Sequence, residues 1–206
     1  IIAASTIDGD LTLTSGHASG ITDSGTVTVA GDLAATTDAS SGVIDMGDLA
    51  VAGTITLTTE GDGAATIDNG TANIDIAAAS VGGNLTLTSG AAAGITDSGT
   101  VTVGGNLIAT TDANSGVIDM DQLAVDGSMA LTTEGDGAAT VVNDVGLIFA
   151  ASTVRGALTA TATEGNITQS SGNLIITGAA TFITVEAESN IILDGSGNAF
   201  AAAVTM

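Results

Sequence analysis

A short apolar-x-Gly signature recurs along the whole chain, and its spacing restricts the fold more than any other feature. Successive copies are 22, 22, 30, 22, 22, 29 and 22 residues apart. The copies begin at Ile7, Val29, Val51, Val81, Val103, Val125, Val154 and Ile176. A fixed period of this length is typical of a structural unit that stacks on its own neighbours. The spacing therefore predicts one elongated domain over residues 1–206, with each glycine at the inward corner where the chain bends.

Within each unit the apolar residues alternate with polar ones. Val27, Val29 and Leu33 share one parity, and the residues between them are threonine, alanine or aspartate, as expected for a strand with one buried face. Turns such as Ser15 to Gly20 divide each coil into about three short strands. Because the same motif returns in the same place, the coils stack in parallel. The fold class we predict is all-β, a right-handed parallel β-solenoid.

A second repeat lies above the 22-residue one. The block Leu11 to Gly16 returns as Leu85 to Gly90, and Ser41 to Met46 returns as Ser115 to Met120, each 74 residues later. We therefore expect about eight to nine coils of 22 residues, with a longer coil of 28–30 residues every third turn. The internal units are 7–80, 81–153 and 154–203, and the last is shortened.

The composition supports a narrow aliphatic core and excludes several partners. The chain has three phenylalanines and no proline, which suits backbone N–H groups committed to a sheet ladder. Its formal charge is −22, with one Lys or Arg residue, so nucleic acid and anionic membrane surfaces are excluded as direct partners. Without cysteine, neither a disulfide nor a thiolate metal site can form. No apolar run is long enough to span a membrane, so membrane insertion is not expected.

Acidic residues recur at equivalent positions of neighbouring coils. Stacking would place them about 4.8 Å apart, where two carboxylates repel by about 1 kcal/mol even in water. Two interpretations stay open: the side chains bind Ca²⁺ through their oxygens, or they splay outward and are screened. No cofactor is required, and Ca²⁺ is the one candidate. The candidate metal ligands are Asp38, Glu60 and Asp62, beside Ser40, and then Asp112, Glu134 and Asp136.

Threonines also recur, at one outward position of seven successive coils. They are Thr14, Thr36, Thr58, Thr88, Thr110, Thr132 and Thr161. A flat threonine face is what an ice-binding solenoid presents, but it is equally what an ordinary parallel sheet presents, because threonine is a good strand former. A second column, two residues earlier, is broken by Ala34, Ile108 and Ala130. Ice binding is therefore the third function that we consider.

Catalysis is the other class of function that a β-helix can support. Arg155 is expected one coil from Asp126 in the same outward column, where a surface ion pair is the simplest interpretation. His17 has Ala91 as its equivalent in the next unit, which indicates an exposed turn residue. The acidic columns repeat with the scaffold, whereas an active site normally occurs once. We expect no enzyme activity, and a carbohydrate-active or carbohydrate-binding β-helix is the alternative.

One segment carries a family resemblance. Val81 to Val103, VGGNLTLTSGAAAGITDSGTVTV, resembles the repeats of filamentous-haemagglutinin-like adhesins secreted by the two-partner route. Within these 206 residues the pattern departs from that family in its two-plus-one coils, and no segment resembles the secretion domain of the family. The resemblance implies an extracellular, right-handed β-helical shaft for adhesion, surface coating or biofilm structure, with surface glycans or cell surfaces as partners.

These observations predict a structural shaft of an extracellular or cell-surface filament, sheath or adhesin. The Ala-rich segments Ile2 to Ile7 and Ala199 to Val204 are similar, so the chain starts and stops at the same point of its repeat. We expect the chain to associate with itself end to end, or to continue into further repeats. The residues expected at that self-association surface are Ile1, Ile2, Phe200 and Val204.

Overall fold

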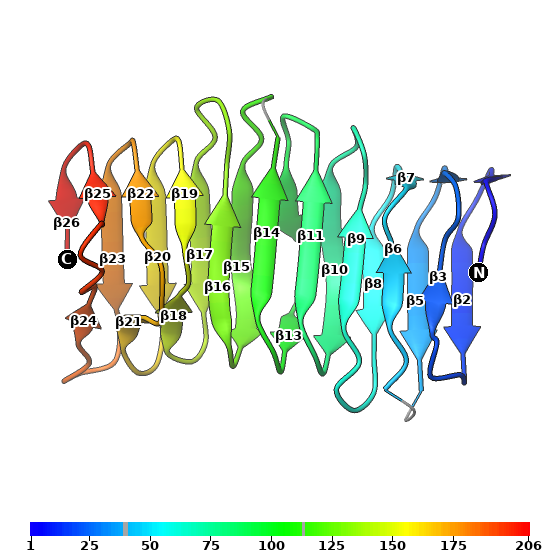
Figure 1. Ribbon diagram of the computed structural model, residues 1–206, viewed down its shortest axis with the longest axis horizontal. Coiled ribbons are helices and arrows are strands. Elements are labelled where there is room, and N and C mark those ends of the chain that lie inside the picture. Colours follow the sequence, from blue (N-terminus) through cyan, green and yellow to red (C-terminus); the bar gives the residue numbers. More distant parts are fainter. Residues whose placement is uncertain (39–40, 113) are drawn as a thin grey trace.

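The structure, a computed structural model, describes residues 1–38, 41–112 and 114–206 (Figure 1). In these residues the chain forms 26 short strands and no helix. It winds around one long axis, with its two termini at opposite ends. Neighbouring strands pair in parallel, about 22 residues apart, over about nine turns. The predicted parallel β-solenoid is confirmed.

Two long sheets form the two broad faces. Sheet 1 contains β2 (Leu11–Ser15), β5 (Leu33–Thr37), β8 (Ile55–Thr58), β10 (Ile74–Val81), β12 (Ile95–Asp97), β13 (Val101–Val103), β15 (Ile118–Val125), β17 (Ala139–Asn143), β20 (Leu158–Ala162), β23 (Ala180–Thr184) and β26 (Val204–Thr205). Most strands of sheet 1 turn at the edge of the solenoid into a strand of the facing sheet, whereas β12 continues into β13 of the same sheet.

Sheet 2 forms the opposite face. It contains β3 (Ile21–Thr22), β6 (Ile44–Met46), β9 (Ala65–Asp68), β11 (Leu85–Ser89), β14 (Leu107–Thr111), β16 (Ser128–Thr132), β18 (Leu147–Phe149), β19 (Ser152–Val154), β21 (Ile167–Gln169), β22 (Leu174–Ile176), β24 (Ile191–Ile192) and β25 (Ala199–Phe200). A short sheet 3 accompanies the first coils and contains β1 (Ser5–Ile7), β4 (Val27–Val29) and β7 (Leu49–Val51).

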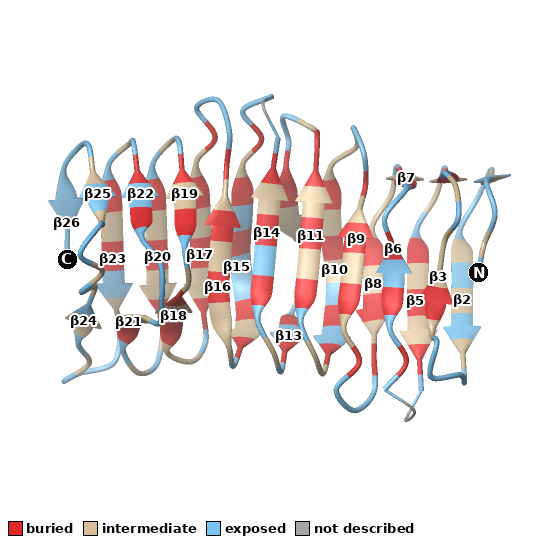
Figure 2. Cartoon of the chain, viewed as in Figure 1, coloured by how far each residue is buried: buried red, intermediate tan, exposed pale blue. Residues whose placement is uncertain are grey.

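The core is one narrow aliphatic column between the sheets. Burial alternates along each strand, as in β11, where Leu85 and Leu87 are fully buried and the alternating Thr86 and Thr88 are half-buried. Figure 2 shows buried residues along the whole rod, with fewer in the two end coils. Phe149, Phe182 and Phe200 meet edge to face, with ring centroids 6.0 and 6.1 Å apart. The aromatic rings therefore fill the core near the C-terminal end.

The glycine of the apolar-x-Gly signature has a different task from the one predicted. Gly105 is partly exposed at an edge turn, so it does not crowd the core. Its N–H donates to the carbonyl of Gly83 in the preceding coil at 3.0 Å. A Cβ on Gly105 would lie 2.7 Å from that carbonyl group. The glycine is needed because two coils approach closely there.

The predicted longer coil is wrong in its geometry. Paired residues of neighbouring coils stay 19 to 24 positions apart throughout, as in Ala139 with Leu158 and Ala180 with Val204. Instead of a wide loop, the interval from Gly53 to Gly83 makes one and a half turns. It contains β8 in sheet 1, β9 in sheet 2 and β10 in sheet 1 again. Because Ile76 to Val81 are extended and mostly small, β10 pairs along β8 as a strand, with a shift of register between Ile76 and Ala78.

The extra half turn moves equivalent segments of the 74-residue unit to opposite faces. β2, β5 and β8 of the first unit lie in sheet 1, whereas the equivalent β11, β14 and β16 lie in sheet 2. In the third unit, β20 and β23 lie in sheet 1 again. Each unit therefore makes three and a half turns, and the two faces exchange roles between successive units.

Two buried asparagines lie where the faces exchange roles. The Asn69 side chain accepts the Val51 N–H at 2.7 Å and donates to the Val51 carbonyl at 3.0 Å. Asn143, 74 residues later, does the same with Val125 at 2.8 and 3.1 Å. In neighbouring coils these ladder bonds come from the backbone, as where Ala52 N–H donates to the Val29 carbonyl. In the following coil no strand pairs with Val51 or Val125. The asparagine amide therefore takes the place of the backbone groups that such a strand would supply.

Candidate functional site

The residues that follow the signature glycines link one coil to the next. The Asp32 carboxylate accepts the N–H and the hydroxyl of Thr54 at 2.7 and 3.0 Å. Asn106, the equivalent of Asp32, accepts both groups of Ser128 at 2.8 and 3.0 Å. Since an amide oxygen serves as well as a carboxylate, these acidic side chains act as hydrogen-bond acceptors within the scaffold.

A second pair of equivalent aspartates stabilises the turn of the following coil. Asp23 accepts the N–H groups of Gly47 and Asp48, at 3.3 and 3.0 Å. Asp97 accepts those of Asp121 and Gln122, at 3.0 and 3.1 Å. Burial raises the pKa of Asp97 above its ordinary value. The two N–H donors lower this pKa and the charge of Asp121 raises it, but burial has the largest effect.

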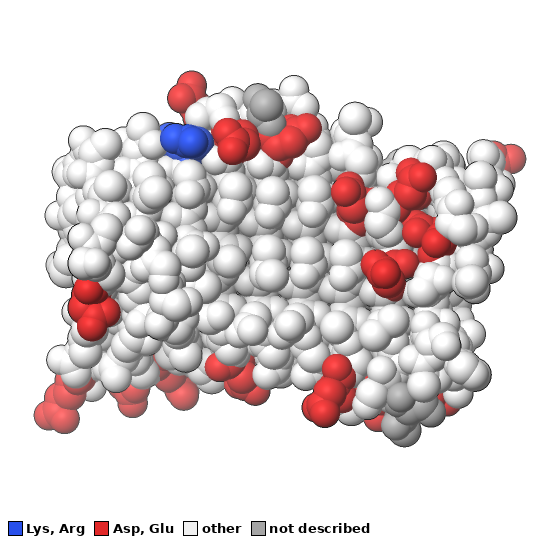
Figure 3. All heavy atoms as spheres, viewed as in Figure 1, with Lys and Arg blue, Asp and Glu red and all other residues white. Residues whose placement is uncertain are grey.

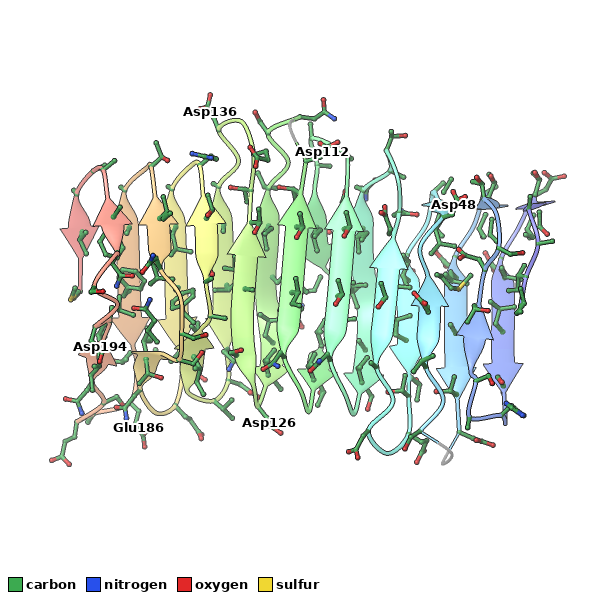
Figure 4. All side chains as sticks on the ribbon, viewed as in Figure 1. Asp48, Asp112, Asp126, Asp136, Glu186 and Asp194 are labelled. Atoms are coloured by element: carbon green, nitrogen blue, oxygen red, sulfur yellow. The ribbon has the colours of Figure 1, made fainter. Side chains whose placement is uncertain are left out.

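The six predicted metal ligands lie in two pairs of stacked edge loops. Glu60 and Asp62 lie in the loop after β8, and Glu134 and Asp136 lie in the loop after β16. Asp38 follows β5 and Asp112 follows β14. Because of the half turn, β5 and β8 end at one edge of the rod and β14 and β16 at the other (Figure 1). Figure 4 shows Asp112 and Asp136 at the same edge, pointing outward.

Hydrogen bonds between stacked loops fix their conformation. Ser41 accepts the Asp62 N–H at 3.3 Å, and Ser115 accepts the Asp136 N–H at 3.1 Å. Both serines have positive φ, 54° and 59°. The Asp112 carboxylate accepts the backbone N–H and the amide of Asn114, both at 3.0 Å. Such local bonds are typical of a loop that carries polar residues at its tip.

The described residues do not bring three acidic or histidine side chains together as a metal site. Ser40, expected beside Asp38, lies outside the described residues. Calcium binding by these loops remains a prediction, which a thermal measurement below addresses.

Buried threonines hold the base of each loop, and the sequence interpretation missed them. Thr59 donates to the Gly63 carbonyl at 2.6 Å and accepts the Gly82 N–H at 3.0 Å. Thr133 donates to the Gly137 carbonyl at 2.6 Å and accepts the Arg155 N–H at 3.0 Å. The signal in the sequence was parity, because each threonine directly follows a strand and continues its series of core-facing positions.

The expected ion pair between Arg155 and Asp126 is wrong. Asp126 lies at the lower edge in Figure 4, in the turn from β15 to β16. The single basic residue of the chain appears at the upper edge in Figure 3. The two residues are separated by an odd number of half turns, which the linear period does not reveal. His17 is exposed in its turn, as expected, and its Nδ1 accepts the Ser19 N–H at 3.0 Å.

The seven-coil threonine column is also divided between the faces. Thr14, Thr36 and Thr58 stack on sheet 1. Thr88, Thr110 and Thr132 stack on sheet 2. Thr161 lies on sheet 1 again, where it pairs with Val142 and Ile183. A single flat face of seven threonines, the basis for considering ice binding, does not form.

A shallow hollow on sheet 1 is the candidate sugar site for the alternative function, a carbohydrate-active or carbohydrate-binding β-helix. Asp121 and Asp144 line it from neighbouring coils, together with Thr100, Gln122, Leu123, Val142 and Thr163. An aromatic platform for a sugar ring is not part of this lining, and the three phenylalanines lie in or against the core. The hollow therefore offers carboxylates without the stacking surface that sugar binding commonly uses.

The predicted self-association residues lie at the open ends of the core. Ile1 is 93% exposed, and Ile2 pairs with Asp23 and packs partly against the core. Ile1 and Ile2 line an end hollow with Leu13 and Ile21. At the other end, Phe200 packs partly against the core and Val204 is 39% exposed. Both end coils leave apolar side chains and strand edges uncovered.

Parallel coils, a continuous core and hydrogen-bonded edge turns define a repeat β-solenoid. The chain belongs to the family described as repeats of unknown function (DUF5649), which matches residues 1–45 and 136–206, more than half of the chain. No curated protein and no solved structure matches the chain. Within the described residues, no helix has the length and apolar character needed to cross a bilayer.

Proposed function

We propose that this chain is a structural rod, a shaft segment of an extracellular or cell-surface filament, sheath or adhesin. The observation that supports this role best is the parallel ladder, which runs from coil to coil and leaves a strand edge at each end. Because each coil contacts mainly its two neighbours, such a body is stiff along its axis and can be extended without a change of fold.

The partners that suit this rod are other copies of the chain or further repeats at its ends, and surface glycans or cell surfaces along its length. The exposed apolar residues of the end coils support the first, since a stacked coil would cover them. The charge of −22 supports an aqueous surface location, as it keeps the rod away from anionic lipids. The rod requires no cofactor in this role.

Size and shape in solution test the end-to-end contact. With about nine turns, one copy is roughly 45 Å long. We expect particles whose length increases in steps of that size with protein concentration, measured by small-angle X-ray scattering and electron microscopy. Ile2→Asp and Val204→Asp should abolish the longer particles. Val185→Asp, at a 64% exposed position in an edge turn, is the matched control. A wild-type chain that stays one length at all concentrations would contradict end-to-end association.

A further inference from the structure

The half turn gives the two faces different charge patterns along the rod. On sheet 2, acidic side chains gather over the first coils, and the middle of the face carries none (Figure 3). The outward residues of β11, β14, β16, β18, β19, β21 and β22 form this uncharged area, which we call the platform. Its residues are Thr86, Thr88, Ile108, Thr110, Ala130, Thr132, Ile148, Thr153, Thr168 and Ile175.

The platform combines apolar and hydroxyl groups in straight columns. Thr88, Thr110, Thr132, Thr153 and Ile175 follow one another in register over five coils. Ile108 and Ile175 are 39% and 40% exposed, which makes them two of the large apolar side chains left on the surface. On sheet 1 the uncharged areas are shorter: β2, β5 and β8 over the first coils, and β17, β20, β23 and β26 over the last coils. Sheet 2 therefore carries the longer uncharged surface.

We propose that two copies of this chain pack face to face, in opposite directions, through their platforms. In a chain of charge −22, the platform is where two copies can approach with the least repulsion. A partner of positive charge would be attracted to the acidic coils instead. The arrangement is self-complementary, because both surfaces repeat every 4.8 Å or so and every threonine hydroxyl can donate and accept.

The opposite direction follows from where the acidic residues lie. With β16 of each copy near the two-fold axis, coils four to eight of the two copies overlap. The acidic side chains of the first two coils of each copy then lie beyond the end of the other copy. A parallel pairing in register would place the acidic coils of both copies side by side. Closed two-fold pairing also uses one surface of each copy, as an isologous interface requires.

The area of the platform sets the expected strength. Five coils of about 4.8 Å and strands about five residues long give roughly 400 Å² for each copy. The total is below the range of stable interfaces, about 1,200–2,000 Å². The pairing of two free copies is thus weak and depends on concentration, while many copies along a filament add their contacts. This inference rests on the proposed structural role but uses a different surface from the ends.

The 74-residue repeat supplies a matched pair of variants. Thr132 on the platform is equivalent to Thr58 on sheet 1, and both are half-buried and followed by the same residues, TEGDG. Thr132→Glu places two carboxylates across the two-fold axis, so the dissociation constant should rise at least about tenfold, which corresponds to 1.4 kcal/mol. Thr58→Glu adds the same charge outside the contact and should leave the dissociation constant within about twofold.

Sedimentation equilibrium up to about 1 mM protein measures the dimer, and X-ray scattering measures its shape. We expect a dimer with an increased cross-section, strengthened by NaCl as repulsion is screened. A wild-type chain that stays monomeric, or equal effects of Thr132→Glu and Thr58→Glu, would overturn the proposal. A dimer that is longer but not thicker would overturn it too, while the end-to-end rod would stand. Thr132-dependent binding of the monomer to crystalline cellulose would assign the platform to a polysaccharide instead.

Discussion

Replacing Asn143 by alanine tests how the chain makes its half turn. The Asn143 side chain is fully buried and makes three hydrogen bonds. It accepts the Val125 N–H at 2.8 Å and donates to the carbonyls of Val125 and Gly146 at 3.1 and 2.9 Å. Asn143→Ala leaves two buried backbone groups of Val125 and the partly buried Gly146 carbonyl without this partner, and each buried group is worth about 1–3 kcal/mol. Allowing for partial rescue by water, we expect the free energy of unfolding to fall by roughly 3–5 kcal/mol.

Urea denaturation followed by circular dichroism measures this loss. Asn173→Ala, at an exposed asparagine, is the control and should stay within about 0.5 kcal/mol of wild type. Asn143→Asp should be destabilised more strongly at neutral pH, because it buries a carboxylate beside two carbonyls. The Asn143→Asp variant should recover stability at acidic pH as the carboxyl is protonated.

Asn69→Ala should behave like Asn143→Ala, since Asn69 makes the equivalent bonds with Val51. The two sites share no partner and lie in different units, so the double variant should show the sum of the two losses. Asn143→Ala with the stability of the control would refute the assignment of the asparagine as a substitute for a strand.

Three further predictions concern the edges of the rod. Because burial raises the pKa of Asp97, the folded chain binds more protons than the unfolded one between the ordinary carboxyl pKa and the raised value. The free energy of unfolding of wild type, measured relative to Asp97→Asn by denaturation at a series of pH values, should therefore fall as pH rises through that window; a constant difference would contradict the shift. Thr133→Val removes a donor to the Gly137 carbonyl and an acceptor for the Arg155 N–H, and should cost about 1–3 kcal/mol in the same assay, whereas Thr132→Val on the outer face should change little. If the acidic loops bind Ca²⁺, millimolar CaCl₂ should raise the melting temperature of wild type and not that of a variant with Asp62→Asn and Asp136→Asn; a melting temperature that is the same in CaCl₂ and in chelator would exclude the site.

Alternation and period were enough to predict the strands, the core and the parallel stacking. Leu85 and Leu87 are buried, whereas Thr86 and Thr88, which alternate with them, are half-buried, as their parity requires. The same reasoning assigned the outward threonines correctly to the surface. It could not tell on which face each strand lies, because a period counts residues and not rotation.

The half turn depends on two residues that the repeat hid. Asn69 and Asn143 are polar residues at core-facing positions, 74 residues apart, inside strands or directly after them. A buried asparagine needs partners for its amide, so this position was a signal that the strand ladder ends nearby. Without the half turn, the linear period placed Arg155 beside Asp126 and all seven threonines in one column.

The half turn also determines how such a chain can grow. Adding one 22-residue coil lengthens the rod and leaves every later surface on its original side. Duplicating a whole 74-residue unit has another effect, because the copy is related to its template by a screw operation of 180°. A patch that arises once and is then duplicated is displayed alternately to the two sides of the rod. A filament built this way can engage neighbours on both sides with one kind of patch, and the number of units between two patches decides whether they face the same neighbour.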